Sequence, residues 1–533
     1  MRWLVLLLVG CAASTAPGRL RFRNQDPVTA VNDRVPVDKP PGAYNEGLVE
    51  YYFAQEFIDP ARFLLTVGEA KPAKNINSLG NVPDSAWFTN RLPTPEEVRR
   101  GPGQGGPDQT QPWRVVGVKI GGMAIGITMI DGRGDKYVLK FDEKNFPETE
   151  SAADVIVQRL TWAMGYNVPE NHVVSFKRDQ LVLDEKAEYA ARSGPKRKMT
   201  PADLDRYLAM AQSEGDTFRG LTSRFIDGKP RGGIEPVGVR ESDPNDRVPH
   251  ELRRDLRGQR VLWAWVNHID IKHQNALVVL TKDNFLEWYA LDFGESLGVG
   301  ALTTSVPRLG YRPTYAWGSA LLSFVTLGAY VHPWERTARH PGFRGLGEFE
   351  AEQFDPGEWS ANHRWRPLDL ADRFDQFWAA EIMLRLTPAH VRAAVEAGQY
   401  TDKRTTDYIV ETLLARQRKL GRWALGRVAP ITNVEATDTT LCFDDLWLRH
   451  DFGAPSTTRY SMTTYDYAGQ QLGSTAMAAT GVRTCLPMRP GSAKDNYTMA
   501  RIEVRRNGKA LPLAFNHVAK GPKGFRVIGI DRR

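Results

Sequence analysis

Short runs of alternating or β-branched apolar residues dominate one stretch of the chain, and they predict strands. The runs are residues 115–120, 127–130 and 136–141. Gly121 and Gly122 open the first connection, and the second is the glycine-rich stretch 131–134. This spacing predicts a three-stranded antiparallel meander. Glycines in such a loop also let backbone N–H groups approach phosphate oxygens, although hairpin glycines are common for steric reasons alone.

The apolar period changes from two to 3.6 after the meander. Residues 148–165 predict a helix, which Gly165 and Pro169 end because neither residue continues a helix well. Its apolar positions are Ala152, Ala153, Val155, Ile156, Leu160, Ala163 and Met164. Three further predictions follow along the chain: a hairpin in 173–183, a charged, helix-prone insertion in 185–214 and a strand in 218–227.

The second half of the chain begins with a helix predicted over residues 248–266, polar first and apolar at its end. Two β-prone runs, 276–280 and 285–291, then flank a turn-like Lys-Asp-Asn and predict a hairpin. Apolar residues at helical spacing in 374–386, 390–397 and 405–425 predict an all-helical region.

From about residue 428 the pattern returns to short alternating runs, which lie at 441–448, 459–467, 499–504 and 525–530. Asn507-Gly508 between two such runs is a strong hairpin signal. We therefore predict a small β-sandwich-like domain over 428–533. Cys442 and Cys485 both fall in it, and an oxidising compartment favours a disulfide between them over two buried thiols.

A chain of 533 residues is too long for one ordinary core. The predicted fold class is α+β, and the predicted segments are 1–10 (signal), 11–43 (tether), 44–112 (aromatic extension and linker), 113–227, 228–427 and 428–533. The stretch 101–112, rich in glycine and proline, is predicted to be a flexible connection. Trp87 and Phe88 in the extension are predicted to pack against the body.

The charge balance is 70 basic against 63 acidic residues, a formal +7. That is mild for this length, and no basic stripe with interleaved aromatics indicates nucleic-acid binding. The amino terminus is more informative, because an apolar run follows Arg2 and stops at Gly10. A run this short predicts an export signal, since a membrane span needs about 20 apolar residues.

The residues Leu8-Val9-Gly10-Cys11 resemble a bacterial lipobox, in which the cysteine is lipidated. The alternative is an ordinary secretory signal that is cleaved after a small residue nearby. We expect the lipoprotein, anchored in the cell envelope by Cys11. Because Ala12 offers no acidic retention signal, an outer-membrane location facing the periplasm or the surface is favoured.

The polar residues with candidate chemistry are dispersed along the body. Lys140 lies within the third predicted strand, next to its last residue. The helix after it carries Glu150 and Asp154, which share one face because they are four residues apart. Asp270 and Asn275 precede the predicted 276–291 hairpin, and Asp292-Phe293-Gly294 follows it. In phosphoryl transfer a loop Asp orients the acceptor, an Asn and a second Asp hold a metal ion, and a strand Lys contacts the phosphates.

This order, with Gly-Tyr-Asn-Val-Pro after the helix, resembles the HipA-type bacterial serine/threonine kinases and, more distantly, the phosphatidylinositol 3/4-kinase-like fold. The resemblance covers about residues 113–425 and implies a two-lobed protein-kinase-like body. It implies that Lys140 binds phosphate with Asp154, better than Glu150, as its partner. It also implies that Asp270 is the catalytic Asp, that Asn275 and Asp292 hold Mg²⁺, and that ATP or another nucleotide is the donor.

Two departures from the family pattern matter. Lys272 stands where the family often has a His, and in protein kinases a Lys at this offset helps to neutralise the transferring phosphoryl group. The loop at Gly121 and Gly122 is not a clean Gly-x-Gly-x-x-Gly, which weakens the prediction of phosphate binding there.

Other interpretations of the same residues stay open. His268, Asp270 and His273 are possible ligands of a hydrolase metal. Asp270 and Asn275 are also suited to capping turns. Lys140 also fits a solvent-exposed lysine on a strand, with no role in binding. An exported kinase lacks an obvious supply of ATP, so the rival to a phosphotransferase acting on a protein or small hydroxyl acceptor is an inactive, pseudokinase-like envelope scaffold.

Overall fold

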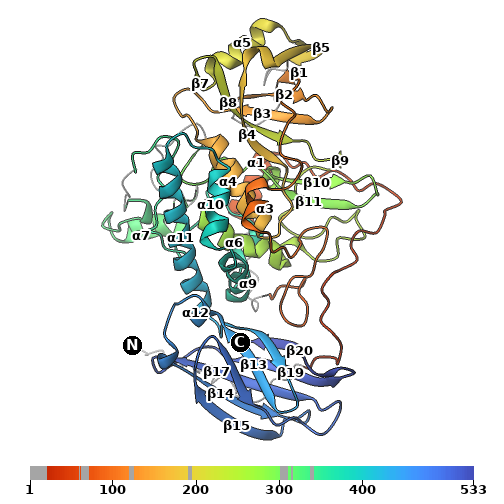
Figure 1. The fold of residues 1–533 in the computed structure, drawn as a ribbon, viewed down its shortest axis with the longest axis vertical. Helices are drawn as coiled ribbons and strands as arrows, with labels where there is room; N and C mark the ends of the chain where they lie inside the picture. Colours follow the sequence, from red (N-terminus) through yellow and green to blue (C-terminus); the bar gives the residue numbers. More distant parts are fainter. Residues whose placement is uncertain are drawn as a thin grey trace, which may run out of the picture. The chain divides into compact units, whose positions relative to one another are not determined.

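The computed structural model describes residues 21–58, 61, 71–118, 125–189, 195–300, 310–311, 313, 316–335 and 341–533 (Figure 1). The chain forms two compact units. One contains Val28–Asn77 and Asn81–Val428, and the other contains residues 21–27, Ser78–Gly80 and Ala429–Arg533. The candidate site lies in the first of these units.

The first unit opens with short helical elements and then forms an eight-stranded sheet in the order β4-β8-β3-β2-β1-β5-β6, with β7 on β8. Their bounds are α1 (Leu48–Phe53), a π-helix (Ala54–Ile58), α3 (Pro95–Arg100), β1 (Trp113–Val118), β2 (Gly126–Ile130), β3 (Lys136–Phe141), β4 (Asn171–Lys177), β5 (Leu181–Tyr189), β6 (Arg197–Lys198), α5 (Pro201–Met210), β7 (Ser213–Glu214) and β8 (Thr217–Arg224). β1, β2 and β3 form the predicted meander, and their buried side chains meet in one core.

Helix α4 (Glu150–Ala163) lies against β4 and β8 and is buried at every position except Glu150 and Trp162. Gly165 ends it with φ 109°, a conformation that favours glycine. A Cβ at this position would meet the Phe88 ring at 2.4 Å, so the chain approaches too closely here for any other residue. Phe88 and Trp87 are both buried, as expected.

The hairpin predicted at residues 173–183 is wrong. β4 pairs antiparallel with β8, whereas β5 leaves through a 3₁₀ turn and pairs in parallel with β1 across the sheet. Among the described residues of the insertion predicted to be helical over 185–214, α5 is the helical part, and β5 continues to Tyr189. Alternation in two neighbouring runs predicts strands but does not determine which strands pair.

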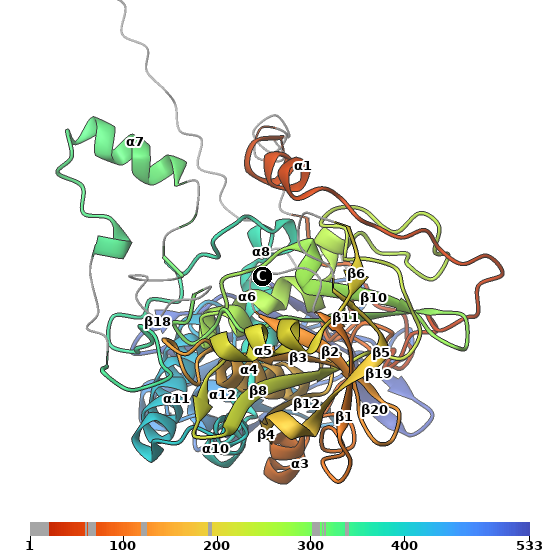
Figure 2. The same cartoon turned by 90° about the horizontal axis from the view of Figure 1, so that it is seen from above.

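The regular elements in the remainder of this unit are mostly helices, with a small sheet in the order β11-β10-β9. The bounds are β9 (Lys229–Pro230), α6 (Arg254–Val266), β10 (Ala276–Leu280), β11 (Leu286–Ala290), α7 (Trp317–Val325), α8 (Arg366–Asp369), α9 (Arg373–Leu384), α10 (Pro388–Glu396) and α11 (Lys403–Leu425). α9 packs on both α6 and α11. α7 stands out from these packed helices in both views (Figures 1 and 2).

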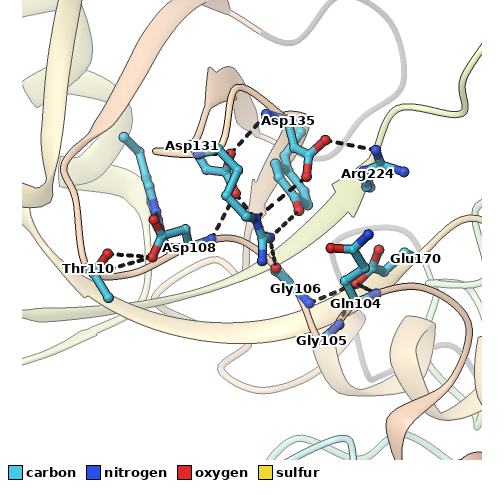
Figure 3. Close-up of polar contacts among 12 residues, drawn as sticks. Gln104, Gly105, Gly106, Asp108, Thr110, Asp131, Asp135, Glu170 and Arg224 are labelled. Atoms are coloured by element: carbon cyan, nitrogen blue, oxygen red, sulfur yellow. Dashed lines mark hydrogen bonds and ion pairs between the residues drawn. The ribbon is translucent and has the colours of Figure 1, made fainter.

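The glycine-rich stretch 101–112 was predicted to be flexible, and that prediction is wrong. Backbone N–H groups of Gln104, Gly105 and Gly106 all donate to one carboxylate oxygen of Glu170, at 2.9, 2.9 and 2.8 Å (Figure 3). Burial would raise the pKa of Glu170, but these bonds and His172 outweigh it and lower the pKa to about 2. The stretch is therefore held against the start of β4.

We expect Glu170→Gln to lower the free energy of unfolding by about 2 kcal/mol, because an amide replaces a charged acceptor of several N–H groups. The lowered pKa means that the contribution of Glu170 is present above pH 4.5 and is lost as the pH falls toward 2. Urea unfolding at pH 7 and pH 3 measures this. Glu185→Gln, at an exposed position, is the control. If Glu170→Gln lost the same unfolding free energy at both pH values, the ionised Glu170 carboxylate would not be the source of the stability.

The second unit contains two antiparallel sheets, β12-β13-β16 and β15-β14-β17-β19-β20, with β18 on β17. The bounds are β12 (Ile431–Ala436), β13 (Thr440–Asp445), α12 (Leu446–Arg449), β14 (Thr458–Tyr465), β15 (Gln471–Ala478), β16 (Arg483–Pro487), β17 (Thr498–Arg506), β18 (Lys509–Ala510), β19 (Ala514–Gly521) and β20 (Gly524–Arg532). Side chains of both sheets share one core. Asn507 and Gly508, at φ 49° and 79°, form the predicted tight turn.

Two further contacts bear on predictions made for this unit. Cys442 and Cys485 lie opposite each other on β13 and β16 and form a disulfide. Phe22, in the predicted tether, lies edge-on to His517, and Arg526 bonds to Asn24 and Asp26. This part of the tether is therefore packed on the sheet formed by β19 and β20.

The predicted fold class, α+β with an antiparallel β domain at the carboxy terminus, is confirmed. Within the described ranges, no helix combines the length and the apolar character that a bilayer crossing requires.

Candidate functional site

Lys140 lies where β3 passes α4 and the end of the β10–β11 hairpin. Its Nζ atom is 2.6 Å from Oδ1 of Asp292 and 3.6 Å from Oδ2 of Asp154. The Asp154 side chain is 1% exposed and that of Asp292 is 47% exposed. Three segments that are distant in the sequence thus bring one cation and two carboxylates together, with one carboxylate open to solvent.

The charges of this cluster depend on one another. Burial would lower the pKa of Lys140, but the Asp292 and Asp154 carboxylates outweigh burial and raise it. Burial raises the pKa of Asp154, and Lys140 and the Asn171 amide, which donates to Oδ1 at 2.6 Å, oppose that rise. Lys140 is therefore a charged group held by its partners, and not a solvated strand lysine.

Glu150 and Asp154 have different positions relative to Lys140. Asp154 forms the ion pair, whereas Glu150 raises the pKa of Lys140 only as its smallest contributor. Both acids line a small cavity of about 10 Å³ together with Lys140. A Cβ at Gly294 would lie 3.5 Å from the Cβ of Glu150, so Glu150 flanks the Asp-Phe-Gly segment.

A second polar group lies in the loop between α6 and β10. Oδ2 of Asp270 accepts hydrogen bonds from Lys272 Nζ at 2.5 Å and from Asn275 Nδ2 at 2.9 Å. Asn275 Nδ2 also donates to the Asp270 carbonyl at 2.7 Å. Burial would lower the pKa of Lys272, but Asp270 outweighs it and raises the pKa. The same contacts fix the loop conformation, as a turn-capping role would require.

The β10–β11 hairpin connects the two groups. Leu291 N–H donates to the Asn275 carbonyl at 3.0 Å, so the two ends of the hairpin lie side by side. Asp292 then adopts φ 57°, an uncommon conformation for this residue type. Phe293 is fully buried near Trp263 and His268. The Asp292 charge contributes to the raised pKa of both Lys140 and Lys272, which places it within electrostatic range of both groups.

A cavity of about 50 Å³ adjoins Asp270, Lys272 and Asn275, and its other walls are mostly apolar and aromatic, including Trp263 and Trp288. The amino-terminal aromatic extension closes around this region. Trp87 stacks on Trp288 with ring centroids 3.6 Å apart, and the Tyr51 ring lies 4.4 Å from that of His273.

Sequence reasoning missed Glu295, the residue after Asp-Phe-Gly. Burial, followed by the Asp270 charge, raises the pKa of Glu295 to about 7. Asp292 and Glu150 also raise it, so Glu295 lies within electrostatic range of both polar groups. An acid directly after a motif that already carries one was the available signal, but nothing in the sequence indicated that its side chain is buried.

We expect Glu295→Gln to raise the free energy of unfolding at pH 8 by on the order of 2 to 3 kcal/mol, because ionising a buried acid beside Asp270 destabilises the folded state. The raised pKa means that the stabilising contribution is present below pH 4.5 and is lost as the pH rises through about 7. Denaturant titrations from pH 5 to 8 test this, with exposed Glu352→Gln as the control. If the unfolding free energies of the parent and of Glu295→Gln changed with pH in parallel, the prediction would be wrong.

The alternative of a hydrolase metal site has no support in the described residues, where no group of three or more His, Cys, Asp or Glu side chains converges on one point. His268 Nδ1 lies 3.0 Å from the Ser296 hydroxyl, and His273 Nε2 lies 3.1 Å from the Glu46 carbonyl oxygen. Burial also lowers the pKa of His268 to about 4. Gly121, Gly122 and Cys11 lie outside the described residues.

No family model and no curated protein matches this chain. Among solved structures it is similar to the Golgi casein kinase, at 11% identity and a TM-score of 0.31 over 59% of this chain and 72% of that one. A second structure of that kinase, with Mn/ADP bound, is similar at 12% identity and a TM-score of 0.31. The same fractions of the two chains are covered. The Helicobacter pylori proinflammatory kinase CtkA is similar at 10% identity and a TM-score of 0.30. The match covers 58% of this chain and 96% of that one. These scores are too low to carry an argument.

Proposed function

We propose that this protein is a kinase-like phosphotransferase that moves a phosphoryl group from a Mg-nucleotide to a protein or small hydroxyl acceptor. The observation that carries the proposal is the convergence of Lys140, Asp154 and Asp292, with the Asp270–Lys272–Asn275 loop entering the same hairpin beside the point where Asp292 leaves it. These are the residue types that phosphoryl transfer uses in the corresponding roles.

The donor set fits a hard divalent cation bound with a nucleotide. Asp292 offers a half-exposed carboxylate and Asn275 an amide oxygen, and Mg²⁺ prefers oxygen ligands of this kind. One or two protein ligands suffice when phosphate oxygens complete the shell. When bound, the Mg-nucleotide would supply the phosphoryl group. In this chain, Asp154 keeps Lys140 charged and oriented, and Lys140 binds phosphate oxygens.

Asp270 and Lys272 act on the acceptor side. Asp270 accepts a hydrogen bond from the acceptor hydroxyl and orients it. It takes up the hydroxyl proton as the acceptor oxygen bonds to the γ-phosphorus and the bond from that phosphorus to the departing nucleoside diphosphate breaks. Asn275 and Lys272 both bond to Oδ2 of Asp270, which restrains the carboxylate. Lys272, held cationic by Asp270, offsets the negative charge of the phosphoryl group in transit.

The test is transfer of label from γ-labelled ATP in the presence of Mg²⁺, by the full-length chain carrying Cys11→Ser. Incorporation into the protein and release of labelled phosphate are both measured. Asp292→Ala should abolish both signals, whereas Asp283→Ala, in the exposed turn of the same hairpin, should leave them unchanged. Equal signals from the two variants would rule out the assigned site.

The rival function is an inactive, pseudokinase-like envelope scaffold. It is favoured by the expected export of the chain, because ATP is scarce outside the cytoplasm. Nucleotide binding without transfer to any acceptor or to water would favour this second function. Transfer that depends on Asp270 would exclude it.

We also propose that Cys11 carries a lipid that anchors the protein in the bacterial envelope, and the lipobox-like sequence supports this. Two or more acyl chains give stable anchoring. Cys11→Ser should then move the protein from the membrane fraction to the soluble fraction. Unchanged fractionation would indicate that Cys11 is not the main attachment.

A further inference from the structure

Helix α7 is an apolar element with its apolar side chains in solvent. The exposed fractions are 63% for Leu321, 46% for Leu322, 79% for Phe324 and 68% for Val325, and Leu327 just beyond the helix reaches 94%. Isolated exposed leucines are ordinary, but a contiguous group of this kind marks an interaction surface. None of these residues belongs to the candidate active site.

The exposed side chains lie on one face. At about 100° per residue, Leu321, Leu322, Phe324 and Val325 share one side of α7, and Ser319 and Ser323 lie on the opposite side. The hydroxyl side is the one covered from within the segment, because Ser323 Oγ lies 2.8 Å from Nε2 of His332.

The chain folds back on itself beyond the helix. Leu327 and Gly328, both at positive φ, turn it, and the rings of Tyr330 and Trp334 then flank that of His332 at 5.0 and 4.3 Å. The result is a compact protrusion over residues 316–335, which we call the α7 hairpin. Its apolar face remains outward.

The sequence around the α7 hairpin identifies the chemistry of its partner. No Asp, Glu, Lys or Arg occurs between Arg312 and Glu335, whereas basic residues cluster immediately outside. Those residues are Arg308, Arg312, Arg336 and Arg339. Trp317 and Trp334 stand near the two ends, the positions that tryptophan prefers at a membrane–water interface. An apolar face with basic flanks and interfacial tryptophans complements an anionic lipid surface.

A second copy of the chain fits this surface less well. Two copies of this basic sequence would bring like charges into a dimer through the α7 hairpin, and like charges repel. A span across the membrane is also excluded for α7, because nine residues are far fewer than the roughly 20 that a crossing needs.

A second apolar group occurs in the same unit. Val49 and Phe53 of α1 are 79% and 56% exposed, and α1 and α7 project from the same side of the body (Figure 2). Tyr51, whose ring contacts His273, connects α1 to the catalytic loop.

We propose that the α7 hairpin inserts shallowly into the surface layer of a bilayer that contains anionic lipid. Phe324, Val325 and Leu327 enter the acyl boundary, and the positive charge of the neighbouring sequence favours anionic lipid. This contact is independent of the Cys11 lipid and of nucleotide chemistry. It turns the side of the body that carries α1 toward the membrane.

The test uses the full-length chain with Cys11→Ser, so that no lipid is attached. Flotation is measured with vesicles of phosphatidylcholine alone and with vesicles containing about one third phosphatidylglycerol. We expect stronger flotation with the anionic vesicles, weakened by salt, and a loss of at least about tenfold in the Leu321→Asp, Phe324→Asp, Leu327→Asp triple variant. The matched control replaces Leu92, Val182 and Val237, which are exposed elsewhere, by Asp.

A labelling experiment locates the contact. Cys442 and Cys485 are disulfide-bonded, so Leu327→Cys in the Cys11→Ser chain adds a single free thiol for an environment-sensitive dye. The dye at residue 327 should respond to anionic vesicles, and the dye at Leu92→Cys should not. Equal flotation of the two triple variants, or equal dye responses, would overturn the proposal. So would a dimer in solution that the Asp substitutions dissociate without any vesicle binding.

Discussion

Asp270→Asn is expected to lower the rate of phosphoryl transfer by roughly 10²- to 10⁴-fold, because the variant loses the base that receives the acceptor proton. Nucleotide affinity should stay within about twofold of the parent value, because the substituted Asn keeps a side-chain oxygen that can accept the hydrogen bonds of Lys272 and Asn275. Steady-state transfer rates at saturating Mg-ATP give the first quantity, and titration of nucleotide binding gives the second.

The control for this variant is Asp283→Asn, the same chemical change at an exposed turn position of the hairpin. It should match the parent in both measurements. A large loss of nucleotide affinity in Asp270→Asn would contradict the assignment of Asp270 to the acceptor side. Unchanged transfer would remove Asp270 from the mechanism.

Lys140→Met is expected to lower the free energy of unfolding by about 3 kcal/mol or more at pH 8, because it leaves the Asp154 carboxylate buried without its cation. The loss of unfolding free energy should be smaller at pH 5. Burial already raises the pKa of Asp154, so this carboxylate takes up a proton more readily at the lower pH. Chemical denaturation at both pH values measures the effect. Lys136→Met, at an exposed position on the same strand, is the control.

A double-mutant cycle separates the ion pair from the packing of the lysine chain. The Lys140→Met, Asp154→Asn double variant should recover part of the stability, because no buried charge is left unpaired. Additive losses from the two substitutions would show that Lys140 and Asp154 do not interact. If Lys140 were a solvated lysine, Lys140→Met would lower the free energy of unfolding by less than about 0.5 kcal/mol.

The elements that carry the site were largely predictable from the sequence. The 3.6 period located α4 and the helices α9 to α11, and alternation located β1 to β3 and the β10–β11 hairpin, each to within a few residues. Lys140, Asp154, Asp270 and Asn275 stand on these elements or directly beside them. The convergence of Lys140, Asp154 and Asp292 followed only from the resemblance to kinases, because local periodicity does not encode which elements meet.

Features that depend on a distant partner were not predictable. The glycine-rich stretch 101–112 has the composition of a linker, and its order comes from Glu170, more than 60 residues away in the chain. The hairpin predicted at 173–183 does not form, because β4 pairs instead with β8, some 40 residues later in the chain. Glu295 was missed because only the fold buries it. In these cases a tertiary contact overrode a correct local pattern.

The proposed function requires the group of Lys140, Asp154 and Asp292 to bind a Mg-nucleotide, and calorimetric titration with ATP measures that binding. The full-length Cys11→Ser protein should bind ATP in the presence of Mg²⁺ and much more weakly without it. Asp292→Ala should abolish the Mg²⁺ dependence, and Asp283→Ala should not. Failure of the unmutated protein to bind ATP or any other nucleotide in Mg²⁺, while it remains folded, would contradict the account.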